Sequence, residues 1–358
     1  MHANRIKSLG GIILGTAVGD ALGLPDEGLS PGRIGRWRRG KVGHRFVFGR
    51  GMISDDTEHT IFVCQALLEH PDDPDAFARS LAGQLRWWLA AVPAGIGWAT
   101  LRAAIKLWLG FSPSRSGVFS AGNGPAMRSA IVGGYFAGDP AGIWAFTAAS
   151  TLITHTDPRA LTAASAVAAA SAWSVLHGPD QAPGGSDITD LFLPLSRPND
   201  GEWPDMVNRM TGAYSSGRTV SRFSESLDPA GRGVSGYAYR TVPVALFAWW
   251  RHYGDFRSTV ESVLACGGDT DTVGAVAGAM AGAVVGHDGI PHEWIEGILE
   301  WPRSVRFMRR AAARLADQAP GDKGSGRVRY FWPALLPRNI LFLVLVMLHG
   351  LRRLLPPY

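Results

Sequence analysis

Two segments of the chain carry glycine at every fourth position, and this spacing restricts the fold more than any other feature. The stripes are Gly11, Gly15, Gly19 and Gly23, then Gly274, Gly278, Gly282 and Gly286. Residues four apart share one face of a helix, so each stripe predicts a helix. Because glycine inside a helix costs roughly 1 kcal/mol relative to alanine, these positions need a packing reason. The simplest is close backbone approach between two buried helices.

A membrane pair is the other known use of this spacing. Both stretches fall short of a span and carry aspartate at one end, so we favour a soluble core. If the two helices face each other, Asp20 and Glu27 come near Asp269 and Asp271. Strand alternation is scarce throughout, which predicts an all-α, compact multi-helix bundle. With 358 residues, 46% of them hydrophobic, the chain can bury a large core.

Two acidic clusters each stand at the expected start of a helix. They are Ser54-Asp55-Asp56-Thr57 and Gly267-Gly268-Asp269-Thr270-Asp271-Thr272. Aspartate and threonine are ordinary helix caps, but one cap accounts for only one aspartate of each pair. Converging carboxylates and hydroxyls suit Mg²⁺ or Mn²⁺ better than zinc, and two clusters could serve a two-metal site. We therefore favour a metal site over a pair of caps.

Three other segments could contact a ligand. Gly122-Asn123-Gly124 opens an alanine-rich helix, where exposed N–H groups can bind an anion, although a plain asparagine turn explains it equally well. His155 precedes the helix expected over 159–175, and it is either a phosphate or ribose contact or a histidine satisfied locally. The stretch from Pro25 to Gly51 is rich in Gly, Pro and Arg. It is expected to be a long loop carrying Glu27, and such loops are often mobile flaps.

Taken together, these motifs resemble the ADP-ribosylglycohydrolase family, which includes dinitrogenase reductase-activating glycohydrolase and the ADP-ribosylhydrolases. The matching pieces are Gly15 to Glu27, Ser54 to Thr57, Gly122 to Arg128, Thr154-His155 with Pro158, Gly236-Tyr237, and Gly267 to Thr272. They occur in the family's order. The resemblance implies a catalytic domain over 1–318, with a basic, hydrophobic tail over 319–358 outside the family pattern. Asp26 and Cys266 depart from the family, which more often has an apolar residue and asparagine there.

The resemblance also implies a binuclear Mg²⁺ or Mn²⁺ centre at the base of a cleft. The implied metal ligands are Ser54, Asp55, Asp56, Asp269, Asp271 and Thr272. Glu27 matches the flap glutamate near the scissile bond and joins Asp55, Asp56 and Asp269 as a catalytic candidate. The positions implied to hold ADP-ribose are Gly122, Asn123, Gly124, His155 and Tyr237.

The implied activity is metal-dependent hydrolysis of the bond that links ADP-ribose to a modified protein side chain, with arginine as the first candidate. Another linkage is the nearest alternative: serine, a nucleic-acid end or a small metabolite. A protein that binds ADP-ribose without hydrolysis, or that neutralises a toxin, is the alternative from a different class. The complete ligand set and Glu27 weigh against it.

The tail is apolar from Tyr330 to Leu351, apart from Arg338, Asn339 and His349. Its uninterrupted run, Ile340 to Leu348, is too short to span a bilayer. Residues 327–353 could lie in a membrane interface, dock on a partner, or pack on their own domain.

Charge and cysteine content restrict the setting of the protein. The net charge of +5 is modest, and no stacking platform or groove-reading helix suggests a nucleic-acid partner. Two cysteines and the lack of a signal-peptide pattern favour a reducing compartment. We expect a cytoplasmic monomer that acts on ADP-ribosylated protein.

Overall fold

The computed structural model describes residues 2–38, 40 and 42–353. Over these ranges the chain forms eighteen α-helices and five 3₁₀ helices, and its only β-structure consists of isolated bridges between loops. The expected all-α fold is confirmed.

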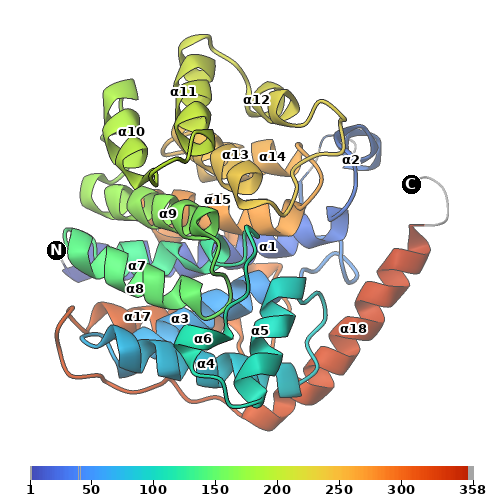
Figure 1. Ribbon diagram of the computed structural model, residues 1–358. Coiled ribbons are helices and arrows are strands. Elements are labelled where there is room, and N and C mark those ends of the chain that lie inside the picture. Colours follow the sequence, from blue (N-terminus) through green and yellow to red (C-terminus); the bar gives the residue numbers. More distant parts are fainter. Residues whose placement is uncertain (1, 39, 41, 354–358) are drawn as a thin grey trace.

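Two antiparallel helices, α1 (His2–Gly23) and α15 (Thr270–Val285), form the centre of the molecule (Figure 1). Their glycine stripes face each other, as predicted. A Cβ atom added to Gly15 would lie 2.1 Å from the carbonyl oxygen of Gly278, and one on Gly19 would lie 1.9 Å from that of Gly274. No side chain fits in this seam, so glycine sets how closely the backbones approach. By length and hydropathy alone α1 could cross a membrane, yet its apolar window is 94% buried within the protein.

The central pair is enclosed mainly by six helices that contact α1 or α15. These are α3 (Asp55–Glu69), α7 (Ala130–Tyr135), α9 (Pro158–His177), α13 (Ala238–Arg251), α14 (Phe256–Leu264) and α17 (Val305–Ala316). The hydrophobic face of α3, which includes Ile61, Leu67 and Leu68, is buried. One large hydrophobic core results, and a smaller separate cluster is formed by Leu24, Met52, Ala94 and Phe342.

The remaining helices cover this core on two sides (Figure 1). One side is formed by α4 (Pro74–Ala90), α5 (Trp98–Trp108), α6 (Pro113–Ser116) and α8 (Pro140–Leu152), and the other by α10 (Gly185–Phe192), α11 (Glu202–Ser215) and α12 (Val220–Leu227). The short helix α16 (His292–Glu296) precedes α17. The 3₁₀ helices are η1 (Leu24–Asp26), η2 (Ala126–Arg128), η3 (Leu193–Leu195), η4 (His287–Gly289) and η5 (Trp332–Ala334).

The stretch from Pro25 to Gly51 is more ordered than a long loop. It contains part of η1 and the helix α2 (Pro31–Arg38). Arg38 forms a buried ion pair with Asp26 and donates to the carbonyl oxygen of Leu22 at 2.9 Å. Asp26 therefore has a structural partner, and the ion pair fixes the base of the segment that carries Glu27.

The tail forms a helix, α18 (Leu335–Arg352), which packs on the domain by one face only. Its buried residues are Leu335, Arg338, Asn339 and Phe342. The helical segment Trp332–Arg352 is long and apolar enough to cross a membrane, and only 22% of its most apolar window is buried. The estimate from the uninterrupted apolar run was thus too short, because the helix continues through Arg338 and Asn339.

Candidate active site

The end of α1 holds both acidic clusters in place. Asp20, on its last turn, accepts hydrogen bonds from the backbone N–H of Ser54 at 2.9 Å and of Thr57 at 3.2 Å. On the other side, the Thr270 hydroxyl donates to the carbonyl oxygen of Gly23 at 2.8 Å. The helix pair that the glycine stripes define therefore brings the two clusters together.

Backbone bonds also join the loops around the site. Gly268 donates to the carbonyl oxygen of Leu29 at 2.8 Å and accepts from Gly28 at 2.7 Å, and Asp269 donates to Val234 at 2.8 Å. Gly268 has φ +79°, and an added Cβ would lie 2.0 Å from the Val234 oxygen. Only glycine can occupy this position, where three loops meet.

Helix capping explains Ser54 but not the aspartates. Ser54 is the N-cap of α3, and its hydroxyl accepts from the N–H of Asp56 at 3.3 Å. Asp269 precedes α15, yet its side chain makes no capping bond there. Its carboxylate instead accepts from the Asn123 amide at 2.6 Å. Helix capping therefore does not account for the carboxylates of the two clusters, and they can serve another role.

The two clusters meet at Asp56. One of its carboxylate oxygens accepts from the hydroxyls of Ser54 at 3.2 Å and Thr272 at 3.3 Å, the latter 216 positions away. The other oxygen is buried and has no hydrogen-bond partner among the residues that the structure describes. A buried carboxyl oxygen in this position could serve as a ligand to a cation.

A cavity of about 560 Å³ opens above this junction. Its walls include nine predicted site residues: Glu27, Asp55, Gly122, Asn123, Gly124, His155, Asp269, Asp271 and Thr272. Ser54 and Asp56 are buried and bonded to this group. Tyr237 does not line the cavity; its hydroxyl donates to Glu202 at 2.7 Å and accepts from Arg159 at 3.3 Å, while the neighbouring Gly236 lines the wall.

Burial and mutual repulsion raise the pKa of the clustered carboxyls. Burial, followed by Asp20, raises the pKa of Asp55 well above its usual value. Burial, followed by Asp55, does the same for Asp56. For Asp271 the causes are burial and then Glu27. Bringing these groups together as anions requires a compensating positive charge.

The donor set fits a hard divalent cation. All six proposed ligands present oxygen, which suits Mg²⁺ or Mn²⁺, and the unpartnered oxygen of Asp56 lies among them. Over the described ranges, no three or more acidic, histidine or cysteine side chains converge in the geometry of a metal site. The proposed ligand residues therefore lie close together, but their oxygens do not surround a single position, because Asp56 is bonded to hydroxyls and Asp269 to an amide.

His155 forms part of the opposite wall. A Cβ on Gly122 would lie 3.0 Å from its Nε2 atom, and one on Gly124 would lie 3.2 Å from its Cε1 atom, so both glycines make room for the ring. Burial and then the Arg128 guanidinium lower the pKa of His155 to about 3. The imidazole is neutral at physiological pH and can hydrogen-bond a substrate without charge.

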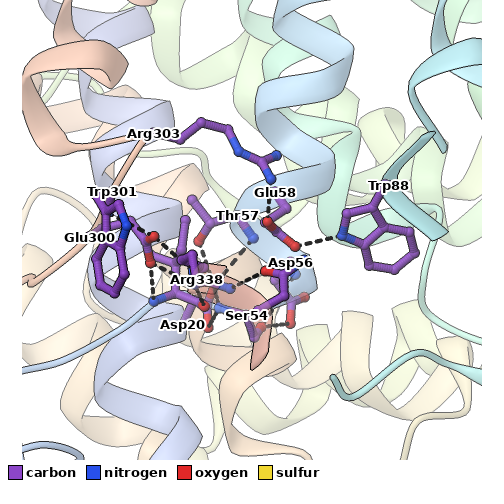
Figure 2. A network of polar contacts seen from close by, with 12 residues as sticks. Asp20, Ser54, Asp56, Thr57, Glu58, Trp88, Glu300, Trp301, Arg303 and Arg338 are labelled. Atoms are coloured by element: carbon purple, nitrogen blue, oxygen red, sulfur yellow. Dashed lines mark hydrogen bonds and ion pairs between the residues drawn. The ribbon is translucent and has the colours of Figure 1, made fainter. Parts of the chain in front are cut away.

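Sequence reasoning missed the buried ion pairs beneath the site (Figure 2). Glu58 on α3 pairs with Arg303 and accepts from the Trp88 indole at 2.6 Å. Arg338 on α18 pairs with Glu300 and donates to the carbonyl oxygen of Ile53 at 2.6 Å, next to Ser54. These partners are too far apart in the chain for a local motif, and a charged residue in an apolar run, such as Arg338, was the only signal.

The all-α fold is shared with known proteins. The chain belongs to the ADP-ribosylglycohydrolase family, whose model matches residues 1–324. A solved structure described as an ADP-ribosylglycohydrolase-related protein complex superposes with a TM-score of 0.67 at 27% identity, covering 88% of this chain and 99% of the other. The family match ends before α18.

Three relatives align over most of their length. An uncharacterized protein of Archaeoglobus fulgidus is 30% identical, covering 85% of this chain and 94% of the relative. The ADP-ribosyl-[dinitrogen reductase] glycohydrolase of Rhodospirillum rubrum is 28% identical, covering 86% and 95%. The ADP-ribosylarginine hydrolase Tri1 of Pseudomonas putida is 27% identical, covering 87% and 78%.

Proposed function

We propose that this protein is a cytoplasmic, Mg²⁺- or Mn²⁺-dependent hydrolase that releases ADP-ribose from arginine side chains of modified proteins. The observation that carries the proposal is the meeting of the two acidic clusters at Asp56, next to a cavity that Asp55, Asp269 and Thr272 line. The names of the Rhodospirillum rubrum and Pseudomonas putida relatives support this reaction class, and the second supports arginine as the acceptor.

Two divalent cations would be held by the oxygens of the two clusters: Ser54, Asp55 and Asp56 on one side, and Asp269, Asp271 and Thr272 on the other. When bound, they would supply positive charge that orients and polarises the oxygens of the sugar. Asp20 is a positioning residue, because it holds the N–H groups of Ser54 and Thr57 rather than facing the cavity.

The cavity volume lies within the usual range for a small-molecule site. The wall formed by Gly122, Asn123, Gly124 and His155 provides backbone groups and a neutral imidazole, which suit a polar, anionic ligand such as a diphosphate. Tyr237 is bonded to Glu202 and Arg159. We assign it to the rim, where the modified protein would enter.

Glu27 is the proposed proton-transfer group. Hydrolysis joins the water oxygen to the anomeric carbon, breaks the carbon–nitrogen bond and delivers a proton to the arginine nitrogen. Glu27 lies at the mouth of the cavity with an exposed outer surface, and burial of its inner side and the nearby Asp269 raise its pKa. A carboxyl with a raised pKa can exchange protons near neutral pH.

The test is release of free ADP-ribose from an arginine-ADP-ribosylated protein, with Mg²⁺ and with EDTA. Wild type is compared with Asp269→Asn plus Asp271→Asn, and with Asp187→Asn plus Asp190→Asn on α10 as a matched control. We expect metal-dependent release that the first variant loses and the control keeps. Metal-dependent release from a serine-linked substrate alone would change the proposed acceptor from arginine to serine. Tight ADP-ribose binding without release from any substrate would favour a binding protein.

A further inference from the structure

The helix α18 packs Leu335 and Phe342 on the domain together with two polar residues, and it exposes most of its other aliphatic side chains. The face on the domain contains Arg338, buried with Glu300, and Asn339, whose amide donates to the carbonyl oxygen of Ala91 at 2.9 Å. The face toward solvent is aliphatic. Its exposed residues are Leu336, Ile340, Leu341, Leu343, Val344, Met347, Leu348 and Leu351. A continuous apolar surface made of eight large side chains on a globular domain marks a contact site.

The surroundings of this face match an anionic lipid surface. Residues 323–358 contain six basic residues and no acidic one. Arg338 is buried against Glu300, and the other five are Lys323, Arg327, Arg329, Arg352 and Arg353, of which Arg327 also pairs with Glu69. Aromatic side chains gather where the helix begins, with Phe331 exposed and the rings of Trp332 and Trp87 5.8 Å apart. Aromatic rings at one end, arginines at the other and aliphatics between are the pattern of membrane-interface helices.

We propose that the outward face of α18 binds the surface of an anionic bilayer, with the helix lying in the plane of the interface. The ion pair on the inner face favours this orientation over a span. Insertion across the bilayer would separate Arg338 from Glu300 and place it in hydrocarbon, leaving a buried carboxylate unpaired in the domain. Docking by the outer face leaves every bond of the inner face intact. Figure 1 shows α18 along one edge of the molecule, where a planar surface can reach it.

The end of α18 lies next to the segment that carries Glu27, here called the flap (residues 24–30). His349 contacts the carbonyl oxygen of Pro25 at 2.9 Å, and Arg353 donates to those of Pro25 and Glu27, both at 2.6 Å. A bilayer under α18 would therefore hold the mouth of the cavity close to the lipid surface. This proposal stands on the helix itself and does not depend on the hydrolase activity.

The test is co-sedimentation of the full-length protein with vesicles. One set is pure phosphatidylcholine, and the other contains about one-third phosphatidylglycerol. The variant Ile340→Gln, Met347→Gln, Leu351→Gln changes three outward positions to a good helix former. The control Leu152→Gln, Leu176→Gln, Leu193→Gln changes three exposed leucines on other helices.

We expect wild type and control to bind the anionic vesicles, and the α18 variant to bind them more weakly by a factor of about ten or more. We also expect added salt to weaken the binding. Equal binding by the α18 variant, or no binding by wild type, would overturn the proposal. Sedimentation of the lipid-free protein as a dimer that the α18 substitutions dissociate would also overturn it, by assigning the face to a second copy of the chain.

Discussion

Arg338 of the C-terminal helix and Glu300 form an ion pair at 2.6 Å in which both side chains are 2% exposed. The same guanidinium donates to the carbonyl oxygen of Ile53, directly before the first acidic cluster. Figure 2 shows Arg338 paired with Glu300. Helix α18 lies outside the family match, yet it supports the loop that leads into the first acidic cluster.

Removing this guanidinium should destabilise the whole domain. Arg338→Ala leaves Glu300 buried without its partner, which typically costs about 3–5 kcal/mol. We expect the free energy of unfolding, measured by urea denaturation, to fall by this amount. Arg329→Ala, an exposed arginine of the same tail, should change it by about 0.5 kcal/mol or less. Equal effects of the two substitutions would mean that the ion pair contributes nothing.

The central glycine seam makes a second stability prediction. Gly15→Ala places a Cβ 2.1 Å from the Gly278 carbonyl oxygen, so α1 and α15 must move apart. We expect a loss of about 1–3 kcal/mol or more, measured by urea denaturation. Gly212→Ala on α11 meets no atom within 4 Å and should stabilise by about 0.5–1 kcal/mol, because alanine has the higher helix propensity.

Much of the fold could be predicted from the sequence, because helix faces and helix starts are set by residues that lie close together in the chain. The glycine period predicted α1 and α15 and their contact, and the two acidic clusters fell at helix starts as expected. The orientation of Tyr237 and the order within residues 25–51 could not be predicted, because Glu202, Arg159 and Arg38 are distant or unpatterned partners. The buried pairs Glu58–Arg303 and Glu300–Arg338 were missed for the same reason. The two acidic clusters indicated a metal site, and the family resemblance supplied its individual ligands, because a cap motif alone does not say which oxygens face a cavity.

Stability of the metal-free protein should depend on pH in an unusual direction. Burial raises the pKa of Asp20 from 3.8 to about 6, so the folded chain binds protons that the unfolded chain has released. Stability then falls as pH rises from about 4 to 6, by up to about 3 kcal/mol from this group alone. Raised pKa values of Asp55, Asp56 and Asp271 extend the loss to higher pH.

Urea denaturation in EDTA at pH 5 and pH 7 measures this effect, with Asp20→Asn as the matched variant. We expect the variant to lose less stability between the two pH values than wild type. Adding Mg²⁺ at pH 7 should restore stability to wild type, because a bound cation compensates the ionised carboxylates. A metal-free protein that becomes more stable from pH 5 to pH 7 would contradict the assignment.

The contact between the tail and the flap predicts a dynamic effect. Arg353→Gln removes bonds to the carbonyl oxygens of Pro25 and Glu27. We expect faster amide hydrogen exchange over residues 24–30 and unchanged exchange in α15, because the flap keeps its bonds to Gly268 but loses its outer support. Arg329→Gln serves as the control, and exchange that rises equally in both variants would show that Arg353 does not restrain the flap.

The amide of Asn123 gives the sharpest test of the site, because it joins the cavity wall of Gly122, Gly124 and His155 to a proposed metal ligand. Its donation to Asp269 at 2.6 Å orients that carboxylate, and it also reaches the Thr241 hydroxyl at 3.0 Å. Asn123→Ala should weaken Mg²⁺ binding about 10–100-fold, the usual effect of losing a group that orients a ligand. Titration calorimetry with MgCl₂ measures this directly, with Asn208→Ala on the exposed face of α11 as the control. Unchanged Mg²⁺ affinity in a folded Asn123→Ala protein would remove Asp269 from the metal site and leave the Asn123 bond as a purely structural link between two loops.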